Sequence, residues 1–205
     1  MSQVKPQIIS IEGNIGAGKT TILRQIEELN LPDVLLLKEP VDEWLEVKDS
    51  AGKNILEHYY SDPKKYAFVF QTVAFNTRLL NLKKAMESGY KTIICERSLQ
   101  SDANIFAKML FEDDTMDEIS YRAYQSLYSS GIQTYSLDKV FYVDVSPEVC
   151  KERIQMRGRS GEESIRLEYL ESCDKYHRDW LESSGLEYPV IKYTSLSNLL
   201  SLILE

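Results

Sequence analysis

Short apolar runs alternate with longer stretches of helical character along the whole chain. The apolar runs are rich in β-branched residues and cover residues 8–11, 34–37, 92–95, 140–145 and 190–193. Each run is almost continuously apolar, which is typical of strands that are covered by helices on both faces. The alternation therefore predicts an α/β fold, a doubly wound five-stranded parallel sheet with helices on both faces.

Helix-start signals mark two of the intervening stretches. Asp62 and Pro63 supply the N-cap and the first-turn proline of a long helix predicted over residues 63–88. Ser146 and Pro147 begin another helix in the same way. These signals fix where two of the helices that cover the sheet begin.

Composition narrows the class of protein and of ligand. With 205 residues, 43% of them hydrophobic, we expect a single domain over residues 1–205. The net charge of −8 argues against nucleic acid as a partner and favours a small phosphorylated or nucleoside-like ligand. Three scattered cysteines, no signal core and no membrane-length apolar run predict a cytoplasmic protein without a membrane partner.

The segment GNIGAGKT at residues 13–20 lies between a predicted strand and a predicted helix. Gly13, Gly18, Lys19 and Thr20 match the phosphate-binding loop pattern, and this context makes a loop that binds nothing the weaker alternative. Backbone amides and the helix N-terminus would hold phosphate oxygens, Lys19 would bridge the β- and γ-phosphates, and Thr20 would bind Mg²⁺. The loop predicts a nucleoside triphosphate site.

Other nucleotide-binding classes lack their own motifs here. No N-K-x-D segment follows a later strand, and D-x-x-G occurs only at residues 49–52, outside any predicted strand, which argues against a GTPase. No apolar strand ends in aspartate-glutamate, as motor ATPases would require. A small-molecule kinase remains.

Charged residues follow two of the predicted strands. Glu39 comes shortly after the second strand, and Glu96 and Arg97 end the third. Carboxyl ends of parallel strands line the ligand crevice, so these side chains should converge beside the phosphate loop. Phosphoryl transfer needs a held Mg²⁺, neutralised charge and an aligned acceptor hydroxyl, which two carboxylates and an arginine can supply. A surface glutamate before a proline turn and a local ion pair are the structural alternatives.

Several motifs together resemble those of the deoxyribonucleoside kinase family, the deoxycytidine, deoxyguanosine and mitochondrial thymidine kinase group. In order along the chain they are residues 11–20, Glu39-Pro40-Val41 with Trp44, Tyr60 before Asp62-Pro63, Phe70-Gln71-Thr72, Glu96-Arg97-Ser98, Arg157-Gly158-Arg159 and Leu167-Glu168-Tyr169-Leu170. The resemblance covers nearly the whole chain and implies a P-loop kinase fold with a lid.

The resemblance implies ATP-dependent phosphorylation of the 5′-hydroxyl of a deoxyribonucleoside, with Mg²⁺. The catalytic residues it implies are Glu39 as general base, Arg97 assisting it, and Lys19; Thr20 and Glu96 would share the metal. Donor-binding residues would be Gly13, Asn14, Ile15, Gly16, Ala17, Gly18, Lys19, Thr20, Thr21, Arg153, Arg157 and Arg159. Acceptor-binding residues would be Glu39, Trp44, Leu56, Tyr60, Phe70, Gln71, Arg78, Arg97, Asp102, Phe106 and Glu162, with Tyr60 and Glu162 on the sugar 3′-hydroxyl and Trp44, Phe70 and Phe106 around the base.

The lid has support from the residues themselves. Arg153 and Arg157 are four apart and therefore share a face near the end of the helix that Pro147 opens. Basic residues there also suit the helix dipole, which is the structural alternative. Gly158 and Gly161 would give a lid the flexibility to close over the transferring phosphate.

A polar pair on the long helix bears on the choice of base. One stripe of this helix contains Gln71, Ala74, Phe75 and Arg78. If the stripe is buried, the Gln71 amide could pair with the edge of a nucleobase. The alternative is that the stripe is rotated toward solvent. In the resembled family, arginine and aspartate at the positions of Arg78 and Asp102 accompany cytosine and purine substrates. We therefore expect deoxycytidine or a purine deoxynucleoside to be preferred over thymidine.

Two alternatives to this function stay open from the sequence. A nucleoside monophosphate kinase, such as one for thymidylate, shares the loop and lid, although Glu39 would repel an acceptor phosphate. A nucleotide-binding regulatory module without transfer chemistry is the other. The resemblance also implies a homodimer, and Tyr121, Tyr124 and Tyr128 predict an amphipathic helix that packs on the core or on a second subunit.

Overall fold

A central parallel sheet of five strands organises the chain in the computed structural model, which describes residues 5–133, 135–159 and 162–203. The strands lie in the order β2-β3-β1-β4-β5. Their bounds are β1 Gln7–Gly13, β2 Val34–Leu37, β3 Thr92–Glu96, β4 Lys139–Val143 and β5 Val190–Lys192. The predicted α/β fold with a five-stranded parallel sheet is confirmed.

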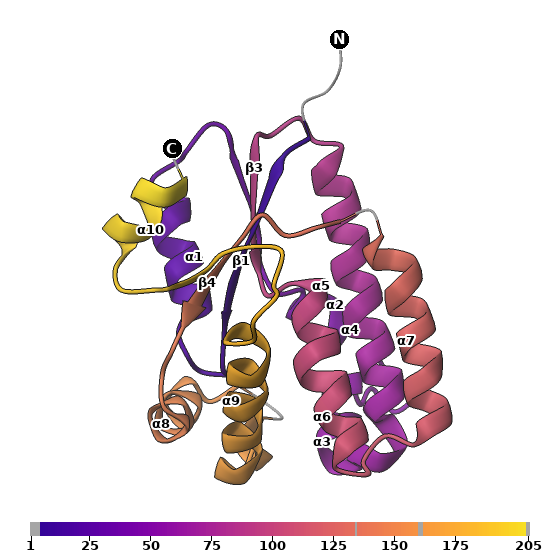
Figure 1. The fold of residues 1–205 in the computed structure, drawn as a ribbon. Coiled ribbons are helices and arrows are strands. Elements are labelled where there is room, and N and C mark those ends of the chain that lie inside the picture. Colours follow the sequence, from indigo (N-terminus) through magenta and orange to yellow (C-terminus); the bar gives the residue numbers. More distant parts are fainter. Residues whose placement is uncertain (1–4, 134, 160–161, 204–205) are drawn as a thin grey trace.

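Helices cover both faces of this sheet, with α1 and α10 on one side and α4 and α7 on the other (Figure 1). The helices are α1 Lys19–Glu27, α2 Val41–Leu45, α3 Ile55–Ser61, α4 Pro63–Met86, α5 Leu99–Ser101, α6 Lys108–Glu112, α7 Glu118–Ile132, α8 Pro147–Arg157, α9 Leu167–Leu181 and α10 Leu196–Ile203. A π-helical turn spans Asp102–Ala107, and a 3₁₀ turn spans Glu162–Ser164. None of the described helices is both long and apolar enough to cross a bilayer.

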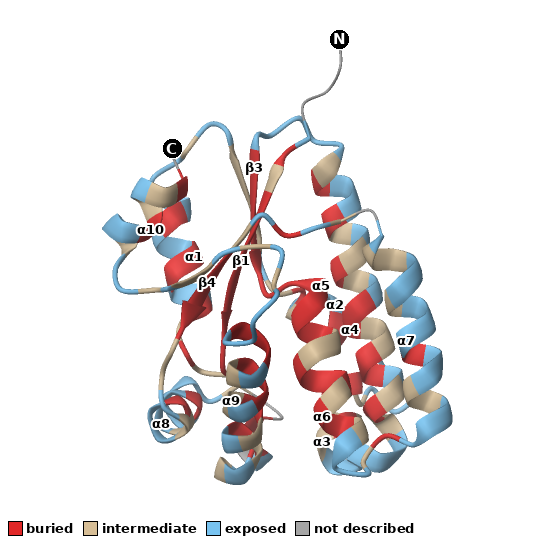
Figure 2. Cartoon of the chain, viewed as in Figure 1, coloured by how far each residue is buried: buried red, intermediate tan, exposed pale blue. Residues whose placement is uncertain are grey.

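Buried residues lie along the strands and on helices at both sides of the sheet (Figure 2). Successive residues of β1 point to opposite faces: Ile8 packs in the cluster that contains Phe75 of α4, and Ile9 packs in the one that contains Leu23 of α1. A strand with two buried faces must be apolar at consecutive positions, which is the pattern seen in the sequence. A third cluster, around Trp44, lies among α2, α3 and α4.

The predicted element ends differ slightly from the observed ones. β4 ends at Val143, two residues early, because Val143 is paired with Gly13, the last residue of β1 before the phosphate loop. α4 begins at Pro63 as predicted, with Asp62 accepting a hydrogen bond from the backbone of Lys65 at 3.3 Å. It ends at Met86, two residues before the predicted end.

Strand register brings the chemistry together at one edge of the sheet. Ile11 of β1 is paired with Glu96 of β3, and Leu37 of β2 is paired with Cys95. The phosphate loop after β1, Glu39 after β2 and Glu96 at the end of β3 are therefore neighbours. This is the carboxyl end of the sheet, where open α/β folds bind ligands.

Candidate active site

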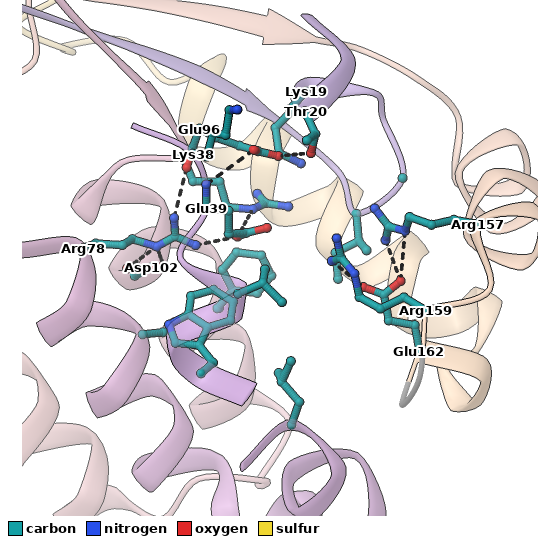
Figure 3. A pocket seen from close by; sticks show the side chains of 18 of the residues that line it. Lys19, Thr20, Lys38, Glu39, Arg78, Glu96, Asp102, Arg157, Arg159 and Glu162 are labelled. Carbon is teal, nitrogen blue, oxygen red and sulfur yellow. Dashed lines mark hydrogen bonds and ion pairs between the residues drawn. The ribbon is translucent and has the colours of Figure 1, made fainter. Parts of the chain in front are cut away.

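A cavity of about 470 Å³ opens at this edge, between the phosphate loop, α4 and the segment after α8. The side chains around it converge from elements far apart in the sequence (Figure 3). Every predicted site residue lines it except Gly13, Asn14 and Ala17. The residues that line it without having been assigned to the site are Arg24, Lys38, Val41, Tyr59, Ala74 and Tyr169.

The phosphate loop is packed tightly against α8. A Cβ on Gly16, whose φ is +81°, would lie 2.5 Å from the carbonyl oxygen of Cys150, so only glycine fits this approach. Lys19 Nζ donates to the carbonyls of Gly13 and Asn14 at 3.1 and 2.9 Å. Burial lowers the pKa of Lys19 to about 8, and nearby Arg97 adds to the shift.

Asn14 stabilises the loop from outside the cavity. Its amide nitrogen donates to the carbonyl of Leu170 on α9 at 2.8 Å, and its Oδ1 accepts from the backbone of Ile15 at 2.8 Å. Asn14, predicted to bind the donor, thus uses its side chain to hold the loop on α9.

Thr20 and Glu96 form the pair that could hold a cation. The Thr20 hydroxyl donates to Glu96 Oε1 at 2.6 Å, and Glu96 Oε2 accepts from the backbone of Glu39 at 3.4 Å. Among the described residues no group of three or more His, Cys, Asp and Glu could cage a metal. A hydroxyl and one carboxylate fit Mg²⁺, which favours oxygen ligands and is usually held by few protein groups together with substrate phosphates.

Four charged side chains form what we call the charged wall: Glu39, Arg78, Arg97 and Asp102. Glu39 Oε1 lies 2.5 Å from Arg78 Nη2 and 3.3 Å from Arg97 Nε. Arg78 also donates from Nε to Asp102 at 3.2 Å and from Nη1 to the carbonyl of Glu96 at 3.0 Å. The Arg78 guanidinium is therefore fixed at three of its nitrogens.

The wall separates the pKa values of its two carboxyls. Burial favours the neutral form of Glu39, but Arg78 and Arg97 outweigh it and hold the pKa at about 2. Burial raises the pKa of Asp102 to about 6, because Arg78 offsets it only in part. Glu39 is consequently an ionised acceptor at neutral pH.

Arg97 occupies an unusual backbone conformation. Its φ is +66°, in the left-handed region that costs a non-glycine residue about 1–2 kcal/mol. Its guanidinium lies over the ring of Phe106, 4.8 Å from the centroid, and Nη1 lies 3.3 Å from Nε2 of His177. Strain of this kind persists where surrounding contacts over-determine the geometry, and it is concentrated at functional sites.

Aromatic rings form a slot beside the wall. Phe70 makes an edge contact with Trp44 at 5.3 Å between centroids and stacks with Tyr59 at 4.9 Å. Gln71, on the next position of α4, is 3% exposed and lines the cavity. Because Arg78 is buried as well, the polar stripe of α4 faces inward and the solvent-facing alternative is wrong.

Arg157, Arg159 and Glu162 form a second group, which we call the lid cluster. Arg157 donates to Glu162 Oε2 from Nε and Nη2 at 3.1 and 2.6 Å, and Arg159 donates to Oε1 at 3.1 Å. Gly158 ends α8 with a φ of +60°, whereas Gly161 lies outside the described residues. Arg153 donates to the carbonyl of Ala17 at 2.9 Å. Arg157 and Arg159, predicted to contact the donor, therefore contact Glu162, which was predicted to contact the sugar of the acceptor.

The sequence contains partial signals for the cavity-lining residues that were not predicted. Val41 and Tyr169 belong to motifs already quoted, and Ala74 lies on the stripe of α4. Lys38 precedes Glu39 and forms an ion pair with Glu27 at 2.7 Å. Lone cations such as Arg24 carry no local pattern that predicts a position at a cavity.

Comparisons with known proteins identify the family of the chain. The family model for deoxynucleoside kinases matches residues 9–201. Deoxycytidine kinase 2 of Gallus gallus is 33% identical over 96% of the chain and 81% of that protein, and human deoxycytidine kinase is 35% identical over 84% and 74%. The mitochondrial deoxyguanosine kinase of Xenopus laevis is 31% identical over 96% of the chain and 80% of that protein. The chain belongs to the deoxynucleoside kinase family.

Proposed function

We propose that this enzyme transfers the γ-phosphoryl group of ATP to the 5′-hydroxyl of a deoxyribonucleoside. The observation that carries the proposal is the position of Glu39. Its carboxylate lines the same cavity as the phosphate loop and is held between Arg78 and Arg97. An acceptor hydroxyl bound there would meet an ionised carboxylate on one side and the donor phosphates on the other.

Each step of the transfer has a candidate residue. Glu39 would accept a hydrogen bond from the 5′-hydroxyl and take its proton as the bond to phosphorus forms, because the hydroxyl becomes more acidic at that stage. Lys19 and the loop amides would hold the donor phosphates. Mg²⁺ held at Thr20 and Glu96 would neutralise charge on those phosphates. Arg97 would keep Glu39 oriented, and the lid arginines would exclude water.

The charged wall also bears on the choice of base. Arg78 and Asp102 are paired at 3.2 Å beside the aromatic slot, with Gln71 on the same face of α4. This pair would occupy the space that a thymine methyl needs, so we propose a preference for deoxycytidine or purine deoxynucleosides. Replacing both, as Arg78→Met with Asp102→Ala, should raise thymidine turnover relative to deoxycytidine turnover. An unchanged ratio would remove the basis for this preference.

A panel of acceptors tests the proposed reaction directly. Phosphoryl transfer from Mg-ATP would be measured with deoxycytidine, deoxyadenosine, deoxyguanosine, thymidine and thymidylate. We expect activity with the first three and weak activity with thymidine. Activity with thymidylate alone would make the enzyme a monophosphate kinase and contradict the role of Glu39, and activity with none would favour a binding module.

We further propose that the chain is a single domain and forms a cytoplasmic homodimer. Tyr124 of α7 is buried against Phe75 at 6.0 Å, so this residue belongs to the core. Ile119 and Leu127 on the same helix are 77% and 41% exposed and are free to contact another copy. Light scattering should return the mass of two chains, and the mass of one would contradict the dimer.

A further inference from the structure

His177 lies directly behind the charged wall. It belongs to α9, its exposure is 0%, and its ring stacks on Tyr142 of β4 at 6.2 Å between centroids. Its Nε2 is 3.3 Å from Arg97 Nη1, and its Nδ1 is 2.6 Å from the carbonyl oxygen of Cys173. The imidazole therefore links the guanidinium of Arg97 to the backbone of α9.

Only one form of the ring satisfies both contacts. A carbonyl oxygen can only accept, so Nδ1 must carry the proton toward Cys173. A guanidinium can only donate, so Nε2 must be unprotonated toward Arg97. These two contacts select the neutral imidazole with its proton on Nδ1, because the partner of one ring nitrogen fixes the role of the other, whereas the Gly13 carbonyl near the ring favours protonation.

The charges around the ring also favour its neutral form. Burial lowers the pKa of His177 well below its ordinary value, and the cations Arg97 and Lys19 lower it further. The carbonyls of Cys173 and Gly13 oppose this shift but are outweighed. A protonated ring would direct an N–H group at the guanidinium and push it away.

Arg97 needs such a support because its backbone alone does not define where its guanidinium lies. The backbone is clamped at the next residue, where Glu12 Oε1 accepts from the amide and the hydroxyl of Ser98 at 2.9 and 2.7 Å. The side chain then extends from the left-handed conformation toward Glu39, which it meets through Nε at 3.3 Å. Among the described contacts, the Phe106 ring covers the face of the guanidinium and His177 meets its Nη1 end.

We propose that His177 is a positioning residue for the phosphoryl transfer reaction: its neutral Nε2 holds Arg97 against Glu39. This role rests on the proposed function, because it gives Arg97 its task beside the acceptor hydroxyl. His177 itself contacts neither substrate. The expected consequence of losing it is a slower chemical step with little change in binding of ATP.

Nuclear magnetic resonance of the ring nitrogens tests the geometry without any assay of activity. The chain has two histidines, so a His58→Gln background leaves His177 as the single ¹⁵N-histidine signal. At neutral pH we expect the neutral ring protonated on Nδ1, with an Nε2 shift that moves when Arg97 is replaced by methionine. A ring protonated on Nε2, a charged ring, or an Nε2 shift indifferent to Arg97→Met would overturn the proposal.

Kinetics test the positioning role. His177→Leu should lower kcat roughly 10- to 100-fold, the loss expected for one hydrogen bond to a charged group, with KM for ATP nearly unchanged. His177→Gln keeps an acceptor near the position of Nε2 and should restore most of the activity. In an Arg97→Met background, His177→Leu should add little, because the contact is already lost.

The matched control is His58, which forms a peripheral pair with Asp49 at 2.8 Å, and His58→Leu should leave kcat unchanged. If His177→Leu does not fold, the glutamine variant and the ring-nitrogen signal still decide: a glutamine variant as slow as Arg97→Met would refute the role. Wild-type protein that phosphorylates no deoxynucleoside would instead refute the proposed function, even where the ring signal is as expected.

Discussion

The charged wall and the lid cluster are built from the same kinds of group, guanidinium and carboxylate, in different surroundings. The wall draws on three separate stretches of the chain, at Glu39, at Arg78 and from Arg97 to Asp102, and the side chain of Arg78 is 7% exposed. The lid cluster lies within six residues of sequence, and the side chains of Arg157 and Arg159 are 35% and 33% exposed. Tertiary structure fixes the first group, whereas the second depends on local contacts.

This difference predicts different energies for similar contacts. Removing one partner from a buried pair leaves an uncompensated charge and costs about 3–5 kcal/mol. The lid pairs differ in that only their arginines are partly exposed, since the Glu162 side chain is 8% exposed; water competes for those guanidinium groups, and we expect each pair to contribute about 1 kcal/mol or less. The wall can therefore serve as a rigid reference for the reacting atoms, while the lid cluster can exchange partners at low cost.

The largest expected effect comes from a matched pair of glutamate-to-glutamine variants. Glu39→Gln keeps the shape but removes the base, so kcat should fall about 10²- to 10⁴-fold while nucleoside binding, measured by calorimetry, stays largely intact. Glu162→Gln should change KM for the deoxynucleoside by about fivefold or less, because the ion pairs of Glu162 with its partly exposed arginines contribute little free energy. Equal losses of binding and rate in Glu39→Gln would make Glu39 a binding group and break the comparison.

A matched pair of arginine-to-methionine variants should separate the two groups in stability. Arg78→Met leaves Glu39 and Asp102 without their shared partner, and we expect the free energy of unfolding to fall by about 3–5 kcal/mol. Arg159→Met should lower it by about 1 kcal/mol or less. Urea denaturation of both variants provides the measurement, and similar losses would show that burial does not distinguish the two groups.

The smallest expected effect is a pH dependence confined to the wall. The pKa of Asp102 is about 6 in the folded chain, above its ordinary value of 3.8, so the folded state takes up a proton first as pH falls. As the pH falls from about 7 to about 5, the free energy of unfolding of the wild type should therefore rise relative to that of Asp102→Asn.

The control for this pH dependence is Asp117→Asn at the N-terminus of α7. A hydrogen bond from the Ser120 side chain lowers the pKa of Asp117, so its titration lies below the tested pH window. Its stability relative to the wild type should not change with pH there. Parallel profiles for Asp102→Asn and wild type would mean that burial does not shift the titration of Asp102.

Local sequence patterns predicted most of the fold and the phosphate loop of the candidate site. Continuous apolar runs predicted all five strands because a doubly covered strand must be apolar on both faces. The phosphate loop was predictable because its glycines, lysine and threonine are consecutive, and Glu39 and Glu96 were predictable from the ends of strands. These features depend on residues close together in the sequence.

The features that escaped prediction depend on distant contacts. His177 reaches Arg97 across 80 positions of sequence, and nothing near it marks a polar role for a buried histidine. The π-helical turn at Asp102–Ala107, which begins at the wall, has no sequence signal of its own. The early end of β4 follows from the end of its neighbour β1 at Gly13, with which Val143 is paired.

The left-handed backbone of Arg97 has a consequence for anyone who would make this enzyme sturdier. Engineering guided by conformational preference alone would place glycine at this position, since glycine adopts such a backbone without strain. That exchange would relax the scaffold and at the same time delete the guanidinium beside Glu39. If Arg97 has the proposed role, stability favours glycine at position 97 and turnover favours arginine, so thermostable variants should be sought elsewhere in the chain.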